Sequence, residues 1–146
     1  MKKILNLIFI IPLTLLLVAC KKDNISPKIL KTEYNINEQA TIDNINITLK
    51  EVYKEQDVIE FIFEIENNRG STITIDPDNN FKFYDNQLLL NNIYDNNTNI
   101  IKKENKLNYT LQYKIEDKKI YSIYFYSGVV ENNIKFTITS SDIKYL

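Results

Sequence analysis

Histidine and tryptophan are absent from the 146-residue sequence, while cysteine occurs once and glycine twice. Because there is no histidine, a Ser-His-Asp or Cys-His arrangement for nucleophilic catalysis is excluded. The single cysteine excludes an internal disulfide, so the packing of the core must stabilise the fold by itself. The scarcity of glycine leaves asparagine to occupy turn positions that require unusual backbone angles.

Neither sign of charge dominates the chain. It has 18 basic and 19 acidic residues, and without Lys2 and Lys3 of its N-terminal segment 16 basic residues face 19 acidic ones, a net charge of −3. A nucleic-acid partner would call for a clustered basic face, so we expect none. The 44% of hydrophobic and 12% of aromatic residues are too many for a disordered chain and suit one globular domain.

The N-terminus has the pattern of a secretion signal. A short basic start, Met1 to Lys3, precedes an apolar run from Ile4 to Ala19. This run of about sixteen residues is shorter than the roughly 20 that a helix needs to span a bilayer. We therefore predict a helical signal peptide over residues 1–19 that takes no part in the fold.

The end of this segment, Leu17-Val18-Ala19-Cys20, resembles the lipobox of bacterial lipoproteins. The resemblance implies that Leu17, Val18 and Ala19 form the cleavage motif and that Cys20 becomes a diacylglyceryl-modified first residue. Two acyl chains suffice for stable attachment, since each buried methylene contributes about 0.8 kcal/mol. The predicted location is the extracytoplasmic face of the cell membrane, with membrane lipid as the first partner. The alternatives are an ordinary signal that leaves a spare thiol, or a helix that is not cleaved.

Residues 20–34 lack periodicity and are interpreted as a tether that begins with the lipidated Cys20. If flexible, a chain of this length spans on the order of 20 Å. Lys21 and Lys22 either attract an anionic lipid surface, at about 1 kcal/mol each, or are plain parts of a solvated spacer.

Residues 35–146 alternate apolar and polar side chains with a period of two, which is typical of half-buried strands. The expected strands are 40–42, 45–49 with a slip at Glu51-Val52, 59–65, 73–75, 81–83, 88–90, 107–115, 120–127 and 134–138. Turn residues separate them at near-regular intervals, and no helical stretch follows residue 20. This pattern predicts an all-β domain, an antiparallel β-sandwich of seven to nine strands.

The order of the expected strands resembles that of the small immunoglobulin-like (telokin-like) domains of secreted bacterial lipoproteins. Two stretches carry this resemblance, Phe63 to Asn68 and Phe81 to Asn86. The resemblance covers residues 36–140 and implies an Ig-like fold without catalytic residues. The chain departs from that pattern in having Asp43-Asn44 in its first turn and residues 102–105 where a Pro-Gly turn is common.

The candidates for chemistry are few, and we expect neither enzyme activity nor a cofactor. Asp76, Asp78 and Asn80 alternate as in the opening of a calcium loop, but Phe81 and Gln87 stand where glycine and a bidentate acid are needed. A turn capped by Asx side chains is the other interpretation. Glu64 and Glu66 share a strand face about 7 Å apart, yet we take them for solvated charges. Nothing in the sequence supports Ser71 or Ser122 as a nucleophile.

Aromatic binding is the more open question. Tyr121, Tyr124 and Tyr126 lie in one expected strand, so at least one of them points outward. Exposed tyrosines serve contact with glycans or proteins, although many only cover the edge of a core.

The main functional hypothesis is therefore a lipid-anchored, non-catalytic module. It would bind a protein or a component of the cell envelope through loops such as Asn91–Asn99. The alternative is a carrier of a small ligand, or an inhibitor, which would need a closed apolar pocket in place of a filled core.

Overall fold

The computed structural model describes residues 31–94, 98–116, 121–128 and 133–146. The predicted signal peptide, the cleavage motif Leu17–Ala19, the lipidation site Cys20 and most of the tether lie outside the described residues. Within the described ranges, no helix combines the length and the apolar character that crossing a bilayer requires.

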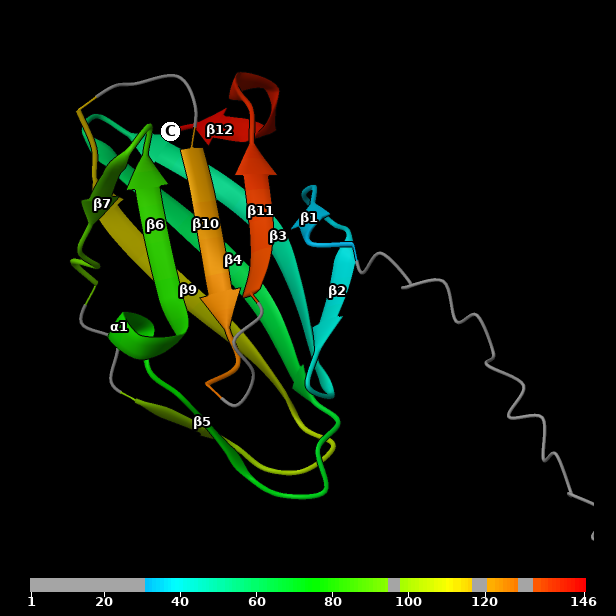
Figure 1. The fold of residues 1–146 in the computed structure, drawn as a ribbon. Helices are drawn as coiled ribbons and strands as arrows, with labels where there is room; N and C mark the ends of the chain where they lie inside the picture. Colours follow the sequence, from blue (N-terminus) through cyan, green and yellow to red (C-terminus); the bar gives the residue numbers. More distant parts are fainter. Residues whose placement is uncertain (1–30, 95–97, 117–120, 129–132) are drawn as a thin grey trace, which may run out of the picture.

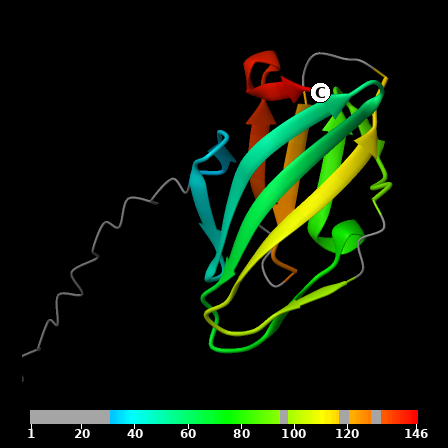
Figure 2. The ribbon, with the colours of Figure 1, turned by 180° about the vertical axis from the view of Figure 1, so that it is seen from behind.

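The described chain folds into two packed sheets (Figure 1). The first sheet has the strand order β1 (Glu33–Tyr34), β11 (Asn133–Ile138), β10 (Tyr121–Tyr126), β6 (Phe81–Asp85) and β7 (Leu88–Leu90). The second, nearer the viewer in Figure 2, has β12 (Ile143–Tyr145), β3 (Ile45–Glu55), β4 (Val58–Asn67) and β9 (Lys106–Lys114), with β2 (Gln39–Ile42) beside β3. A separate ribbon pairs β5 (Ile73–Ile75) with β8 (Asn99–Ile101).

Most neighbouring strands are antiparallel, in agreement with the predicted sandwich. The two exceptions involve short strands near the chain's ends: β1 lies parallel to β11, and β12 lies parallel to β3. Glu33 and Tyr34, the last two residues assigned to the tether, thus already belong to a sheet.

The number of strands differs from the prediction of seven to nine, because the described residues contain twelve. The additional strands are β1, β8 and β12, each of two or three residues. β1 and β12 each pair with a longer strand, whereas β8 pairs with β5, which is equally short. Two single helical turns, α1 (Pro77–Asn80) and η1 (Ser140–Asp142), also correct the expectation that no helical stretch follows residue 20.

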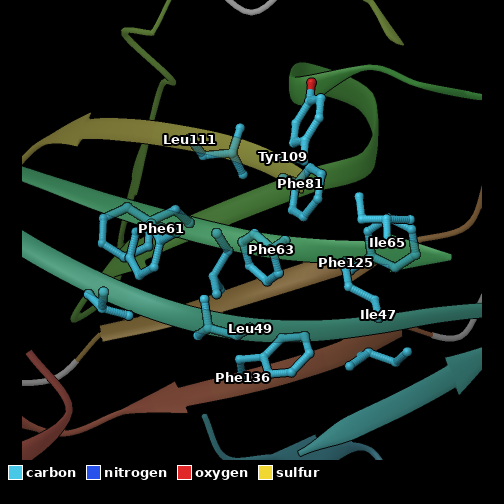
Figure 3. Close-up of a cluster of buried hydrophobic side chains, with 14 of the residues drawn as sticks. Ile47, Leu49, Phe61, Phe63, Ile65, Phe81, Tyr109, Leu111, Phe125 and Phe136 are labelled. Carbon is cyan, nitrogen blue, oxygen red and sulfur yellow. The ribbon is translucent and has the colours of Figure 1, made fainter. Parts of the chain in front are cut away.

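The core is aromatic and lies between the two sheets (Figure 3). Phe83 of the first sheet is fully buried, with its ring 5.0 Å from Phe61 and 4.6 Å from Tyr113 of the second sheet. Phe81 stacks on Tyr109 at 5.6 Å, again across the two layers. Since aromatic pairs contribute about 0.5–1.5 kcal/mol beyond their buried area, these contacts stabilise the packing of one sheet on the other.

Strand β3 carries the irregularity expected near Glu51-Val52: its register against β4 shifts between Leu49 and Glu51. The shift coincides with a change of partner on the other edge of β3. Residues 45–48 pair there with β2, and residues 52–54 pair with β12. A bulge twists and bends a strand, which allows the long strand β3 to pair with both β2 and β12 on the same edge.

Asparagine and other L-residues occupy the left-handed turns, as expected from the scarcity of glycine. Asp43 and Asn44 have φ angles of 49° and 56°, which form the type I′ geometry of a two-residue hairpin. Glu104, with a φ of 61°, adopts the same region without the local hydrogen bonding that makes asparagine tolerable there.

Asn67, at the end of β4, fastens three segments together. Its side chain is fully buried, and its Nδ2 donates to the carbonyl oxygens of Ser71 and Ile101, both at 2.9 Å. Its Oδ1 accepts from the backbone N–H of Arg69 at 3.0 Å. Its backbone bonds to Glu104 and Asn105 in addition. We call this set of bonds the Asn67 clasp.

Candidate functional site

Strand β10 divides its tyrosines between the two faces of the first sheet. Tyr121 is buried in the core, whereas Tyr124 and Tyr126 are half-buried on the outer face. The alternation predicted from the sequence is therefore confirmed, and it leaves two tyrosines pointing away from the sandwich.

A third tyrosine comes from the neighbouring strand β6. Tyr84 lies opposite Ser122 of β10, and its ring is 5.6 Å from that of Tyr124 in an edge-to-face arrangement. Sequence reasoning missed Tyr84 because adjacency across strands depends on the sheet order β10–β6, which no local pattern reveals. The signal was the alternation itself: Phe81, Phe83 and Asp85 point inward, so Lys82 and Tyr84 must point outward.

These rings border a hollow of about 440 Å³ on the outer face of the first sheet. We call it the tyrosine groove; its lining residues are Tyr84, Asn86, Gln87, Ser122, Tyr124 and Tyr126. Every lining side chain ends in a hydroxyl or a carboxamide, and none carries a formal charge. From Asn86 to Tyr126 the groove extends on the order of 20 Å, given the rise of roughly 3.3 Å per strand residue and the pairing of Tyr84 with Ser122.

The surroundings of Tyr126 in the groove favour the neutral form of its phenol. Burial raises the pKa of the Tyr126 phenol, and the neighbouring Tyr84 and Tyr124 act in the same direction. Lys82 and Lys135 flank Tyr124 on the adjacent strands. Lys82 donates to the carbonyl oxygen of Asp78 at 2.6 Å, and Lys135 forms an ion pair with Glu33. Within the part of the chain that the structure describes, these two flanking cations each have a partner in the protein.

The calcium-loop candidates Asp76, Asp78 and Asn80 form a capped turn at the start of α1. The side chain of Asp76 accepts from the N–H groups of Asp78 and Asn79 at 2.9 and 3.0 Å. Asn80 accepts from the N–H of Asp76 at 2.8 Å and donates to the carbonyl oxygen of Tyr126 at 2.7 Å. The alternative interpretation, a turn capped by Asx side chains, describes these bonds. Among the described residues, no group of three or more Cys, Asp or Glu side chains is placed to hold a metal ion.

The paired carboxylates Glu64 and Glu66 lie on the outer face of β4, as expected. Lys106 on β9 lies between them, with its Nζ 3.8 Å from a Glu64 oxygen and 3.9 Å from a Glu66 oxygen. Asn46 donates to Glu66 at 3.0 Å. The pair is thus part of a surface charge network. The two serines lie apart from it, since Ser122 lines the tyrosine groove and the carbonyl of Ser71 belongs to the Asn67 clasp.

The interior of the sandwich is filled by side chains and not hollowed for a ligand. Phe61, Phe63, Phe83, Phe125 and Phe136 are fully buried and pack against one another and against the tyrosines of the core. A hollow of about 580 Å³ lies on the outer face of the second sheet. Its lining includes Glu51 and Lys144, which bind each other at 2.9 Å. This hollow, lined by charged side chains in the described part of the chain, differs from the closed apolar pocket that the carrier hypothesis requires.

The predicted binding loop Asn91–Asn99 is only partly a loop. The N–H of Gln112 donates to the side chain of Asn92 at 3.0 Å, and the N–H of Ile93 donates to the carbonyl of Gln112 at 2.8 Å. These bonds fix its first residues along the edge of β9, while Asn99 begins β8. Residues 95–97 lie outside the described residues.

Comparison with known proteins finds similarity in fold alone. No family model matches the chain, and no curated protein is detectably similar in sequence. Among solved structures, the yjhA protein from Bacillus subtilis has a TM-score of 0.60 at 12% identity, over 72% of this chain and 98% of that one. A second Bacillus subtilis protein, ycdA, described as a putative lipoprotein, has a TM-score of 0.59 at 12% identity over 71% of this chain. The chain spans 39% of the length of ycdA.

Proposed function

We propose that this chain is a lipid-anchored bacterial surface protein whose non-catalytic sandwich binds a protein or an envelope component through the tyrosine groove. The observation that carries the proposal is the groove itself. Three half-buried tyrosines from two adjacent strands share an outer face and border one hollow. Tyrosine on a sheet surface provides a large, rigid contact area at a low cost in side-chain entropy.

Two observations support the anchoring half of the proposal. The sequence Leu17-Val18-Ala19-Cys20 has the order of residues expected of a lipobox. A protein of similar fold, ycdA, is described as a putative lipoprotein. Acylated Cys20 would hold the domain at the extracytoplasmic face, and a tether reaching on the order of 20 Å would keep the groove close to the membrane.

We also propose that the sandwich is of the immunoglobulin-like (telokin-like) type. The support is its two-layer antiparallel architecture together with the order of strands seen in the sequence. An experimental structure with another connection between the sheets would overturn this assignment.

The test of the binding function is photo-crosslinking on intact cells. A photoreactive amino acid replaces Gln87, an exposed lining residue, in the full-length lipidated protein. Adducts should form at this position, and Tyr84→Ala and Tyr124→Ala should each reduce their yield at least fivefold. The matched control places the same photoreactive residue at Tyr145, which is 67% exposed on the second sheet. Equal yields at the two positions, or no adduct at Gln87, would contradict binding through the groove.

A further inference from the structure

The tyrosine groove has the chemistry of a site for an uncharged sugar chain, and this inference rests on the function proposed above. Its six lining side chains offer three phenol rings, two carboxamides and one hydroxyl. A pyranose ring presents C–H groups on its flat face and hydroxyls around its rim. The flat face packs on an aromatic ring, while carboxamides both donate to and accept from hydroxyls.

The geometry of the groove favours a polymer over a single small molecule. The lining extends on the order of 20 Å along β6 and β10, from Asn86 in the turn after β6 to Tyr126 at the end of β10. A long, shallow site of this kind leaves the ends of a chain free, whereas drug-sized ligands are held in sites that enclose most of their surface.

The sheet topology argues against a peptide bound as an added strand. Strand β10 pairs with β6 on one side and with β11 on the other, so its backbone groups are already used in both ladders. A peptide that adds a strand needs an unpaired edge. The groove therefore has only side chains to offer, and all of these are polar at their tips.

The charges around the groove argue against an anionic polymer. None of the six lining residues is charged, and the flanking cations Lys82 and Lys135 are bound to the Asp78 carbonyl and to Glu33. Glu33 offsets the charge of Lys135, so of these two described residues only Lys82, bound to an uncharged carbonyl, keeps an uncompensated charge, and one cation is a weak counter-charge for a polyanion. We propose that the tyrosine groove binds an uncharged polysaccharide of the cell envelope in which the protein is anchored.

The test uses the mature protein purified from membranes in a detergent without a sugar headgroup, because a glycoside detergent would compete for the site. The probes are cello-, malto-, xylo- and chitohexaose and the uncharged polysaccharide fraction of the producing cells. Binding is followed by the ultraviolet difference spectrum of tyrosine, since the chain has no tryptophan. We expect at least one probe to bind with an affinity that changes less than twofold between 50 and 500 mM salt.

The variants separate the groove from the rest of the surface. Tyr84→Ala and Tyr124→Ala should each weaken binding at least tenfold, and Gln87→Ala, in an exposed turn, at least threefold. Tyr124→Phe keeps the ring and should lose less than fivefold. Tyr145→Ala, on the other sheet, should bind like the parent protein. The circular dichroism spectrum of each variant shows whether it is folded. If a tyrosine variant is not folded, Gln87→Ala still tests the groove.

Two outcomes would overturn the inference: no binding of any probe, or binding that all the groove variants retain. The crosslinking test separates this failure from failure of the proposed function. A defined polypeptide adduct at Gln87, with no sugar binding, would refute the polysaccharide and leave a protein-binding groove. Absence of both would refute the groove as a binding site.

Discussion

The replacement of Asn67 by alanine should cost far more stability than its polar nature suggests. The change removes the three side-chain hydrogen bonds of the Asn67 clasp at 2.9, 2.9 and 3.0 Å. A hydrogen bond contributes about 0.5–1.5 kcal/mol net, and the side chain is fully buried, so water does not replace the lost partners freely. We expect the free energy of unfolding to fall by about 3 kcal/mol.

The assay is urea unfolding followed by circular dichroism, with Asn68→Ala as the matched control. Asn68 is the next residue along and is exposed, and the hydrogen bond from its backbone N–H to the carbonyl of Asn44, at 2.9 Å, survives the change. The control should lose less than about 0.5 kcal/mol, the usual limit for a surface substitution. In a thermal scan, Asn67→Ala should lower the midpoint by about 12 °C.

A second variant, Asn67→Asp, tests the direction of the bonds. An ionised carboxylate would face the carbonyl oxygens of Ser71 and Ile101 with no proton to donate, which should raise its pKa above the unfolded value. The protonated form can restore one donor, so stability relative to the parent should be greater at pH 4 and should be lost as the pH rises through the folded pKa. A loss below 1 kcal/mol for Asn67→Ala, or no pH dependence for Asn67→Asp, would refute the role assigned to the clasp.

Four further outcomes are expected. Phe83→Ala should lower the free energy of unfolding by about 4 kcal/mol in urea titrations, because it empties a site between rings 4.6 and 5.0 Å away. Glu104→Gly should raise it by about 1 kcal/mol, since glycine adopts a φ of 61° without strain, and a lower midpoint would contradict this. Burial raises the pKa of Tyr109 to about 12. The unfolded phenol ionises near pH 10, so Tyr109 by itself should lower stability by about 1.4 kcal/mol per pH unit between pH 10 and 12. Burial also raises the pKa of Tyr113, so the slope of stability from urea titrations across that range should be steeper than this value, and a shallower one would contradict the reasoning. Finally, Cys20→Ala should move the protein from the membrane fraction to the soluble fraction on cell fractionation; retention in the membrane would refute the lipid anchor.

The long strands could be predicted from the sequence because each has one buried face. In β4 the buried residues Ile59, Phe61, Phe63 and Ile65 alternate with half-buried ones along the whole strand. The strands β1, β8 and β12 escaped prediction because none of them has two buried residues at alternating positions, unlike the similarly short β5 with Ile73 and Ile75. From the sequence, the segment of helix α1 is interpreted only as a calcium loop or a capped turn, although Asp76 at its N-cap followed by Pro77 is a start signal for a helix.

Only part of the candidate site could be predicted from the sequence. Alternation in β10 was enough to place Tyr124 and Tyr126 on one face, but Tyr84 joins them only because β6 is the neighbour of β10. The Asn67 clasp was hidden for the same reason. In the sequence Asn67 is one of many asparagines, and its partners Ser71 and Ile101 become neighbours only when β4 and the β5–β8 ribbon are in place.

The short edge strands of the first sheet bear on how copies of this protein would interact with one another on a membrane. β1 offers two residues and β7 three, so neither presents a long row of unpaired amides to a passing copy. Molecules that diffuse in two dimensions meet far more often than the same molecules in solution, and long unpaired edge strands would allow them to form intermolecular sheets. If the proposed lipid anchor confines the protein to a membrane, these short borders leave the first sheet little edge through which neighbouring copies could pair.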